Sequence, residues 1–145
     1  DWNRRAFPGY ANEVVLMPGA GTFVRRLMQN GLRLAVVTAS DAALAKAALE
    51  RNGIMDAFDV VVTENETGLC KNGPGIFECA ARMLDVPPDS CVVFEDSLYA
   101  MRAAKAAGMA VCALCPPERQ AEANACCAVA DVCVQNLEML LPADE

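Results

Sequence analysis

The chain has 145 residues, of which 54% are hydrophobic and 21% charged, and its net charge is −7. This length and apolar content are sufficient for one domain with an ordinary core. The acidic balance argues against nucleic-acid binding, which requires a basic face, and no apolar run approaches the length of a membrane span. We therefore expect a cytoplasmic protein without nucleic-acid or membrane partners. Because the sequence begins with Asp1 and not Met, we expect it to be processed, trimmed or incompletely represented at its amino end.

From residue 18 onward, helical and strand-like periodicities alternate. The predicted elements in chain order are a helix from 18 to 30, a strand at 32–37, a helix from 41 to 52, a strand at 60–62, a helix at 74–84, a strand at 91–94, a helix at 97–107, a strand at 110–114, a helix at 118–128, a strand at 132–134 and a helix at 136–141. Such alternation is typical of βαβ units with a parallel sheet. It predicts an α/β fold, and residues 1–17 do not fit the alternation.

Polar side chains follow three of the predicted strands. Thr38 and Ala39 come after the first strand, Lys71 lies in a glycine-rich loop after the second, and Glu95 and Asp96 follow the third. Ligands bind at the carboxyl ends of strands in open α/β sheets. A hydroxyl, a backbone N–H, an ammonium and two carboxylates there would suit phosphate binding and a divalent cation.

Each of these motifs also has an ordinary structural reading. A threonine after a strand is often a turn residue, and a loop lysine is usually solvated, so that it contributes little to the core. The acidic pair could merely cap the helix that begins at Ser97. The adjacent carboxylates after a buried apolar run are the strongest of the three signals, because such a pair needs a cation or a helix N-terminus nearby.

The eight cysteines allow two interpretations. Cys112 and Cys115 have the spacing of metal ligands, with Cys126, Cys127 and Cys133 downstream. A zinc site usually combines two such pairs or adds histidine, and the chain has no histidine. We therefore expect reduced thiols packed as small hydrophobic side chains.

Together, the order and spacing of the motifs resemble the haloacid dehalogenase (HAD) superfamily, in its β-phosphoglucomutase and phosphoglycolate phosphatase-like branch. The similarity runs from Met17 to the end of the chain and is most specific over residues 87–109, which contain Val92-Val93-Phe94-Glu95-Asp96-Ser97. The resemblance implies a three-layer Rossmann-like core at residues 18–145, with residues 1–17 as the tail of a helical cap or a linker.

The resemblance also implies an activity. It is that of a Mg²⁺-dependent phosphatase or phosphomutase that acts on a small phosphorylated metabolite through an aspartyl-phosphate. In that family the residue at Thr38 binds the transferring phosphoryl group, Lys71 stabilises it, and Glu95 and Asp96 help to hold Mg²⁺. Thr38 and Lys71 are thus the candidate catalytic residues, with Ala39 as an additional phosphate ligand.

The chain departs from the family pattern in its first motif. The family's Asp-x-Asp, which supplies the nucleophile, occurs nowhere in the sequence, and the usual Lys-Pro-x-Pro-Asp is replaced by Lys71-Asn72-Gly73-Pro74-Gly75. In the family the nucleophile strand lies between the strands that end at Thr38 and Glu95. We therefore expect a core that lacks its central strand and most of its cap, so that the 145 residues are not the whole functional protein.

Two alternatives remain at this point. A receiver domain also uses acids, a hydroxyl and a lysine around Mg²⁺, but its acids come first in the chain. A non-catalytic HAD-like binding module, or an inactive fragment, is the stronger rival, because no nucleophile is visible. Whether the chain is an enzyme, its oligomeric state and its substrate stay open.

Overall fold

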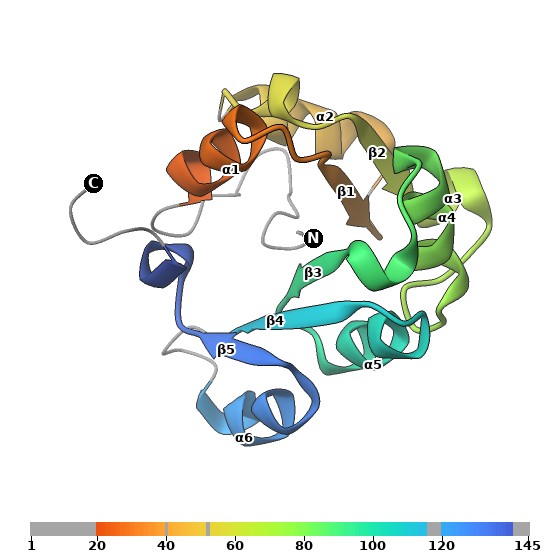
Figure 1. The fold of residues 1–145 in the computed structure, drawn as a ribbon. Helices are drawn as coiled ribbons and strands as arrows, with labels where there is room; N and C mark the ends of the chain where they lie inside the picture. Colours follow the sequence, from red (N-terminus) through yellow and green to blue (C-terminus); the bar gives the residue numbers. More distant parts are fainter. Residues whose placement is uncertain (1–19, 40, 52, 116–119, 141–145) are drawn as a thin grey trace.

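A computed structural model describes residues 20–39, 41–51, 53–115 and 120–140 (Figure 1). The strands are β1 Ala35–Thr38, β2 Val60–Thr63, β3 Val92–Glu95, β4 Ala110–Leu114 and β5 Val132–Val134. The α-helices are α1 Ala20–Gln29, α2 Ala42–Arg51, α3 Glu64–Thr67, α4 Gly75–Leu84, α5 Leu98–Ala106 and α6 Gln120–Val129. Short 3₁₀ helices are η1 Met55–Ala57, η2 Pro88–Ser90 and η4 Leu137–Leu140. None of the helices in the described ranges is long and apolar enough to cross a membrane.

The described strands form two parallel sheets. β1 pairs with β2, while β4 lies between β3 and β5. Every connection between paired strands contains a helix, as parallel pairing requires, and within each sheet the carboxyl ends of the strands therefore lie at one edge. The predicted parallel α/β fold is confirmed.

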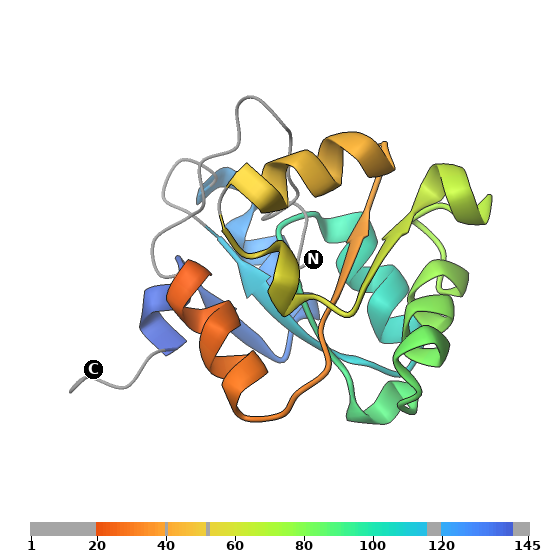
Figure 2. The same cartoon turned by 90° about the horizontal axis from the view of Figure 1, so that it is seen from above.

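Helices cover both faces of the sheets (Figures 1 and 2). Successive strand residues point to opposite faces, so that Val36 packs with α1 and α2, whereas Val37 packs with α4 and α5. In β4, Val111 and Cys112 divide in the same way. Each of the two hydrophobic cores includes residues from both sheets. The helix layers thus hold the two sheets in one three-layer structure.

The predicted helix ends have visible physical causes. At the start of α2, the Asp41 carboxylate accepts a hydrogen bond from the backbone N–H of Ala43 at 2.7 Å. After α1, Gly31 has a φ of 80°, a left-handed conformation that favours glycine. At the end of α4, Asp85 takes the left-handed conformation with a φ of 60° and its N–H closes the helix.

Two predicted elements differ in extent or type, and one observed helix was not predicted. The strand predicted at 32–37 begins only at Ala35, since Leu32 is 55% exposed and the Arg33 guanidinium donates to the carbonyl of Leu84. The segment predicted as a helix at 136–141 is a 3₁₀ turn over the described residues. The short helix α3 was not predicted, although Thr63 and Glu66 have the spacing of a capping box.

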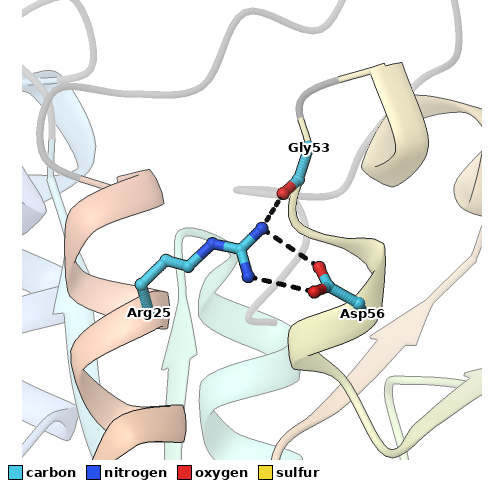
Figure 3. A network of polar contacts seen from close by, with 3 residues as sticks. All are labelled: Arg25, Gly53 and Asp56. Atoms are coloured by element: carbon cyan, nitrogen blue, oxygen red, sulfur yellow. Dashed lines mark hydrogen bonds and ion pairs between the residues drawn. The ribbon is translucent and has the colours of Figure 1, made fainter.

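A surface network joins α1 to the segment after α2 (Figure 3). The Arg25 guanidinium binds both oxygens of Asp56, at 3.1 and 3.0 Å, and also donates to the carbonyl of Gly53. The hydrogen bonds from Arg25 lower the pKa of the Asp56 carboxyl. This network fixes α1 against η1 on the same face of the β1–β2 sheet.

Candidate active site

A buried ion pair lies at the carboxyl edge of the sheets. The Lys71 ammonium is 2.6 Å from a carboxylate oxygen of Glu95, and the two side chains are 2% and 0% exposed. Glu95 is the last residue of β3, whereas Lys71 follows α3 on the β2 side of the molecule. The pair therefore links the two sheets. The expectation that Lys71 is a loop side chain with little part in the core is wrong, because burial makes it the counter-charge of a buried carboxylate.

The other oxygen of Glu95 binds the start of α5. It accepts hydrogen bonds from the backbone N–H groups of Asp96 and Ser97, at 3.0 and 3.3 Å. The side chain of Ser97 makes no capping bond. Both N–H groups precede the first residue of α5, so Glu95 orders the turn before the helix and also holds Lys71, but it does not cap α5.

A second carboxylate orients the Lys71 loop. The Glu64 carboxylate accepts a hydrogen bond from the backbone N–H of Lys71 at 2.8 Å. Glu64 opens α3, whose N-cap is Thr63: the Thr63 hydroxyl accepts from the N–H of Glu66 at 3.0 Å. Sequence reasoning missed Glu64, because a contact across seven residues of irregular loop has no periodicity, but the Thr63 and Glu66 spacing was readable.

Thr38 ends β1 at the same edge. It is 1% exposed and pairs in register with Thr63, which is 0% exposed. Ala39 follows as an exposed residue. The strand register thus connects Thr38, through Thr63 and Glu64, to the loop that carries Lys71.

Asp96 lies in the turn between β3 and α5 and is partly exposed. Its position directly after Glu95 puts two carboxylates where one strand ends. Hard oxygen donors of this kind suit Mg²⁺, which uses few protein carboxylates and keeps water and phosphate ligands. Both oxygens of Glu95 already contact Lys71 or backbone N–H groups, so a cation at this place would share Glu95 with Lys71 and would take Asp96 as its other carboxylate.

An apolar cavity of about 290 Å³ lies between the two sheets. Its lining includes Val37 of β1, Val93 and Phe94 of β3, and Phe77 of α4. Among the described strands, β1 pairs only with β2 and β3 only with β4, so each turns one edge toward the other sheet. The cavity is thus lined mainly by apolar side chains, and it lies between an edge of β1 and an edge of β3 that pair with no other described strand.

The cysteines differ from the sequence expectation. Cys127 and Cys133 form a disulfide, which overturns the expectation that all thiols are reduced. Cys112 and Cys115 do not act as a pair, because a spacing of three along a strand puts them on opposite faces: Cys112 packs in the core under α1 and Cys115 in the core under α5. Burial raises the pKa of the Cys112 thiol to about 12.

Comparison with known proteins identifies the family. A family model described as haloacid dehalogenase-like hydrolase matches residues 3–108. The chain is 41% identical over 76 residues to fructose-1-phosphate phosphatase YqaB of Escherichia coli and 35% identical over 94 residues to β-phosphoglucomutase of Bacillus subtilis. These matches cover 52% and 65% of this chain, but only 40% and 41% of the relatives.

A solved structure shares the fold. CbbY from Rhodobacter sphaeroides in complex with phosphate superposes with a TM-score of 0.77 at 30% identity, and the match covers 88% of this chain and 57% of that one. The chain therefore spans about half the length of the relatives it matches. Both the motifs at the carboxyl edge and the match over residues 3–108 place the chain in the haloacid dehalogenase-like hydrolase family.

Proposed function

We propose that this chain forms the core of a Mg²⁺-dependent phosphatase or phosphomutase that acts on a small phosphorylated metabolite through an aspartyl-phosphate. The observation that carries the proposal is the buried pair of Lys71 and Glu95 beside Asp96, at the carboxyl ends of the strands. Burying a lysine and a glutamate is costly unless the two charges are paired and hydrogen-bonded, and such pairs are common at functional sites. The relatives YqaB and β-phosphoglucomutase, by their names, act on phosphorylated sugars.

Lys71 would supply positive charge to the transferring phosphoryl group. Glu95 holds the ammonium at 2.6 Å, and Glu64 fixes the backbone of the same residue. A cation held in place before the reaction stabilises the transition state without reorganisation. The Lys-Pro-x-Pro-Asp pattern is lost in this chain, and the contact of Glu64 anchors the altered loop.

Thr38 and Ala39 would hold the phosphoryl oxygens. They lie between the end of β1 and the start of α2, so that a hydroxyl and backbone N–H groups stand at a helix N-terminus, the usual setting for a bound phosphate. Asp96 and Glu95 would hold Mg²⁺. The cation, when bound, supplies positive charge that offsets the phosphate oxygens.

The nucleophile would come from a strand that fills the cavity between β1 and β3. Such a strand would pair with both edges, and its aspartate would emerge at the same end as Thr38 and Glu95. The first aspartate of the motif would attack phosphorus and form the aspartyl-phosphate, while the second, protonated, would donate its proton to the metabolite oxygen as the bond from phosphorus to that oxygen breaks. Water would then release phosphate in a phosphatase, and a second substrate hydroxyl would accept it in a mutase.

The rival is a phosphate-binding module without catalysis, favoured by the absence of Asp-x-Asp from the 145 residues. The upstream reading frame of the gene separates the two. An Asp-x-Asp strand encoded there supports the enzyme, and its absence from the complete protein overturns that proposal.

The activity test uses p-nitrophenyl phosphate with Mg²⁺. We expect no turnover by the 145-residue chain and turnover by the longer protein that supplies the aspartate strand. In that protein, Asp96→Asn and Thr38→Ala should each lower kcat by roughly 10²–10³, because each removes one preorganised electrostatic contact. Asp96→Asn should also change the Mg²⁺ dependence, whereas Thr38→Ser, which keeps the hydroxyl, should be milder. An Asp96→Asn enzyme with full activity and an unchanged Mg²⁺ response would rule out the assignment of Asp96.

A further inference from the structure

Three cysteine sulfurs converge behind β4 and β5, outside the candidate active site. Cys115 directly follows β4, Cys127 lies on α6 and Cys133 on β5. All three sulfurs lie within 4.8 Å of one another, and those of Cys115 and Cys133 are 3.4 Å apart. Three different elements therefore bring soft donor atoms to one point.

We propose that, once the Cys127–Cys133 disulfide is reduced, these three cysteines bind one thiophilic metal ion such as Zn²⁺. A Zn–S bond is about 2.3 Å long, so two sulfurs on one ion lie at most about 4.6 Å apart. The sulfurs of Cys115 and Cys133 already lie within this limit at 3.4 Å. Those of Cys127 and Cys133 are bonded to each other, so reduction must let them separate before both can bind one ion. Thiolates select soft or borderline ions such as Zn²⁺ and Cu⁺ over Mg²⁺.

The burial of the three side chains gives the site both a wall and an entrance. Cys115 is buried in the core, Cys133 is partly buried and Cys127 is exposed. An ion could arrive past Cys127 and be shielded on its inner side by Cys115. Three protein ligands leave a fourth position for water or a small thiol, which is the arrangement of an open zinc site.

The neighbouring cysteines do not share this geometry. Cys126 is next to Cys127 in the sequence but points into the core, where it is 3% exposed. Cys79 is partly buried on α4, with its sulfur 4.0 Å from that of Met83. The cluster thus forms because α6 packs against β4 and β5. In Figure 1, α6 lies below β5.

Metal binding and the disulfide exclude each other. The disulfide uses the sulfurs of Cys127 and Cys133, whereas binding requires both as thiolates. A dithiol reductant would transfer two electrons and two protons to the S–S bond, giving two thiols while it becomes a disulfide. The ion would then displace the thiol protons. Only the reduced chain should therefore bind metal.

The test is a cobalt titration, with Co²⁺ as a coloured probe for Zn²⁺. The reduced 145-residue chain should take up one Co²⁺ and develop intense sulfur-to-cobalt absorption in the near ultraviolet, which one equivalent of Zn²⁺ abolishes and excess Mg²⁺ does not. The oxidised chain should give no such band. Excess Mg²⁺ also separates this site from the carboxylates at Glu95 and Asp96.

Variants locate the ligands. Cys127→Ser, at an exposed position, should keep the fold by circular dichroism and weaken Zn²⁺ binding at least about tenfold, the smallest loss expected even for a residue that only supports a ligand. Cys115→Ser and Cys133→Ser should do the same, and Cys79→Ser is the matched control. No sulfur-to-cobalt band in the reduced chain, the same band in the oxidised chain, or an unchanged metal affinity of Cys127→Ser would each overturn the proposal.

Discussion

The two sheets use the same device to align their strands. In the β1–β2 sheet, the N–H of Asp59 donates to the carbonyl of Leu34 at 2.7 Å, and its carboxylate accepts from the N–H of Leu34 at 2.8 Å. In the β3–β4–β5 sheet, Asp131 makes the same two contacts with Val111, at 2.9 and 2.8 Å. Each aspartate directly precedes a strand. The local construction of the two halves is therefore equivalent.

The halves differ at their carboxyl ends. β1 and β2 end in the buried threonines Thr38 and Thr63, and β3 ends in Glu95, whereas β4 and β5 end in the apolar residues Leu114 and Val134. The polar groups thus gather at the ends of β1, β2 and β3, whereas β4 and β5 end in apolar residues. The chemistry of this fold depends on how the two halves meet, not on either half alone.

The ion pair between the halves should give the largest effect on stability. Lys71→Met leaves the Glu95 carboxylate buried without its counter-charge, and removal of one partner from a buried pair costs about 3–5 kcal/mol. We expect the free energy of unfolding in urea to fall by about that amount. The double variant Lys71→Met/Glu95→Leu should regain most of the loss, because no buried charge remains. Equal stability of Lys71→Met and the parent would show that the pair does not join the halves.

Loss of an aromatic contact between the halves should give the second largest effect on the free energy of unfolding. The rings of Phe23 on α1 and Phe94 on β3 meet edge to face with centroids 5.2 Å apart, in the core that spans both sheets. Phe23→Ala should lower the free energy of unfolding by about 3 kcal/mol, the low end for a buried phenylalanine. Phe23→Leu, which keeps most of the apolar volume, is the control and should lose less. Similar losses in the two variants would mean that the ring contact, and not the buried apolar volume, dominates here, and would contradict this prediction.

Substitutions of Asp59 and Asp131, the equivalent aspartates of the two sheets, should give the smallest effects on the free energy of unfolding. Asp59→Ala should cost about 1 kcal/mol, since the N–H of Leu34 loses its acceptor, and Asp59→Asn should be close to neutral because the amide oxygen can replace it. Asp131 additionally binds the Lys105 ammonium at 2.9 Å, so Asp131→Asn should still lose a little stability. High salt should remove that difference.

The contribution of the Asp131 carboxylate to stability should depend on pH. The hydrogen bond from Lys105, and then that from Val111, lower the pKa of the Asp131 carboxyl. A carboxyl with a lowered folded-state pKa stabilises the fold above its unfolded pKa, and this contribution is lost as the pH falls through the folded value. The difference in melting temperature between the parent and Asp131→Asn should therefore be present at pH 7 and shrink on acidification. A difference that grew toward acid would contradict the role of the ion pair.

The sequence by itself determined the elements and their order. The strands at 110–114 and 132–134 were predicted with the boundaries that the structure has. Their short apolar runs are preceded by Gly108 and Asp131, residues that favour turns. Such residues set strand boundaries through local conformation, over a few positions. The family was also readable, since the acidic pair and the residues around it form a local motif.

The tertiary structure alone decided the contacts that cross the chain. Lys71 is buried against Glu95, and Glu64 anchors its backbone. Cys115 likewise meets Cys127 and Cys133. These residues are separated in the sequence, so no local pattern predicts that they lie close together. A local pattern records whether a residue is polar or apolar and which face it occupies, but not which distant group will share that face. From the sequence, a lysine in a loop is expected to be exposed to solvent. Only when the fold buries it does its charge need a carboxylate beside it.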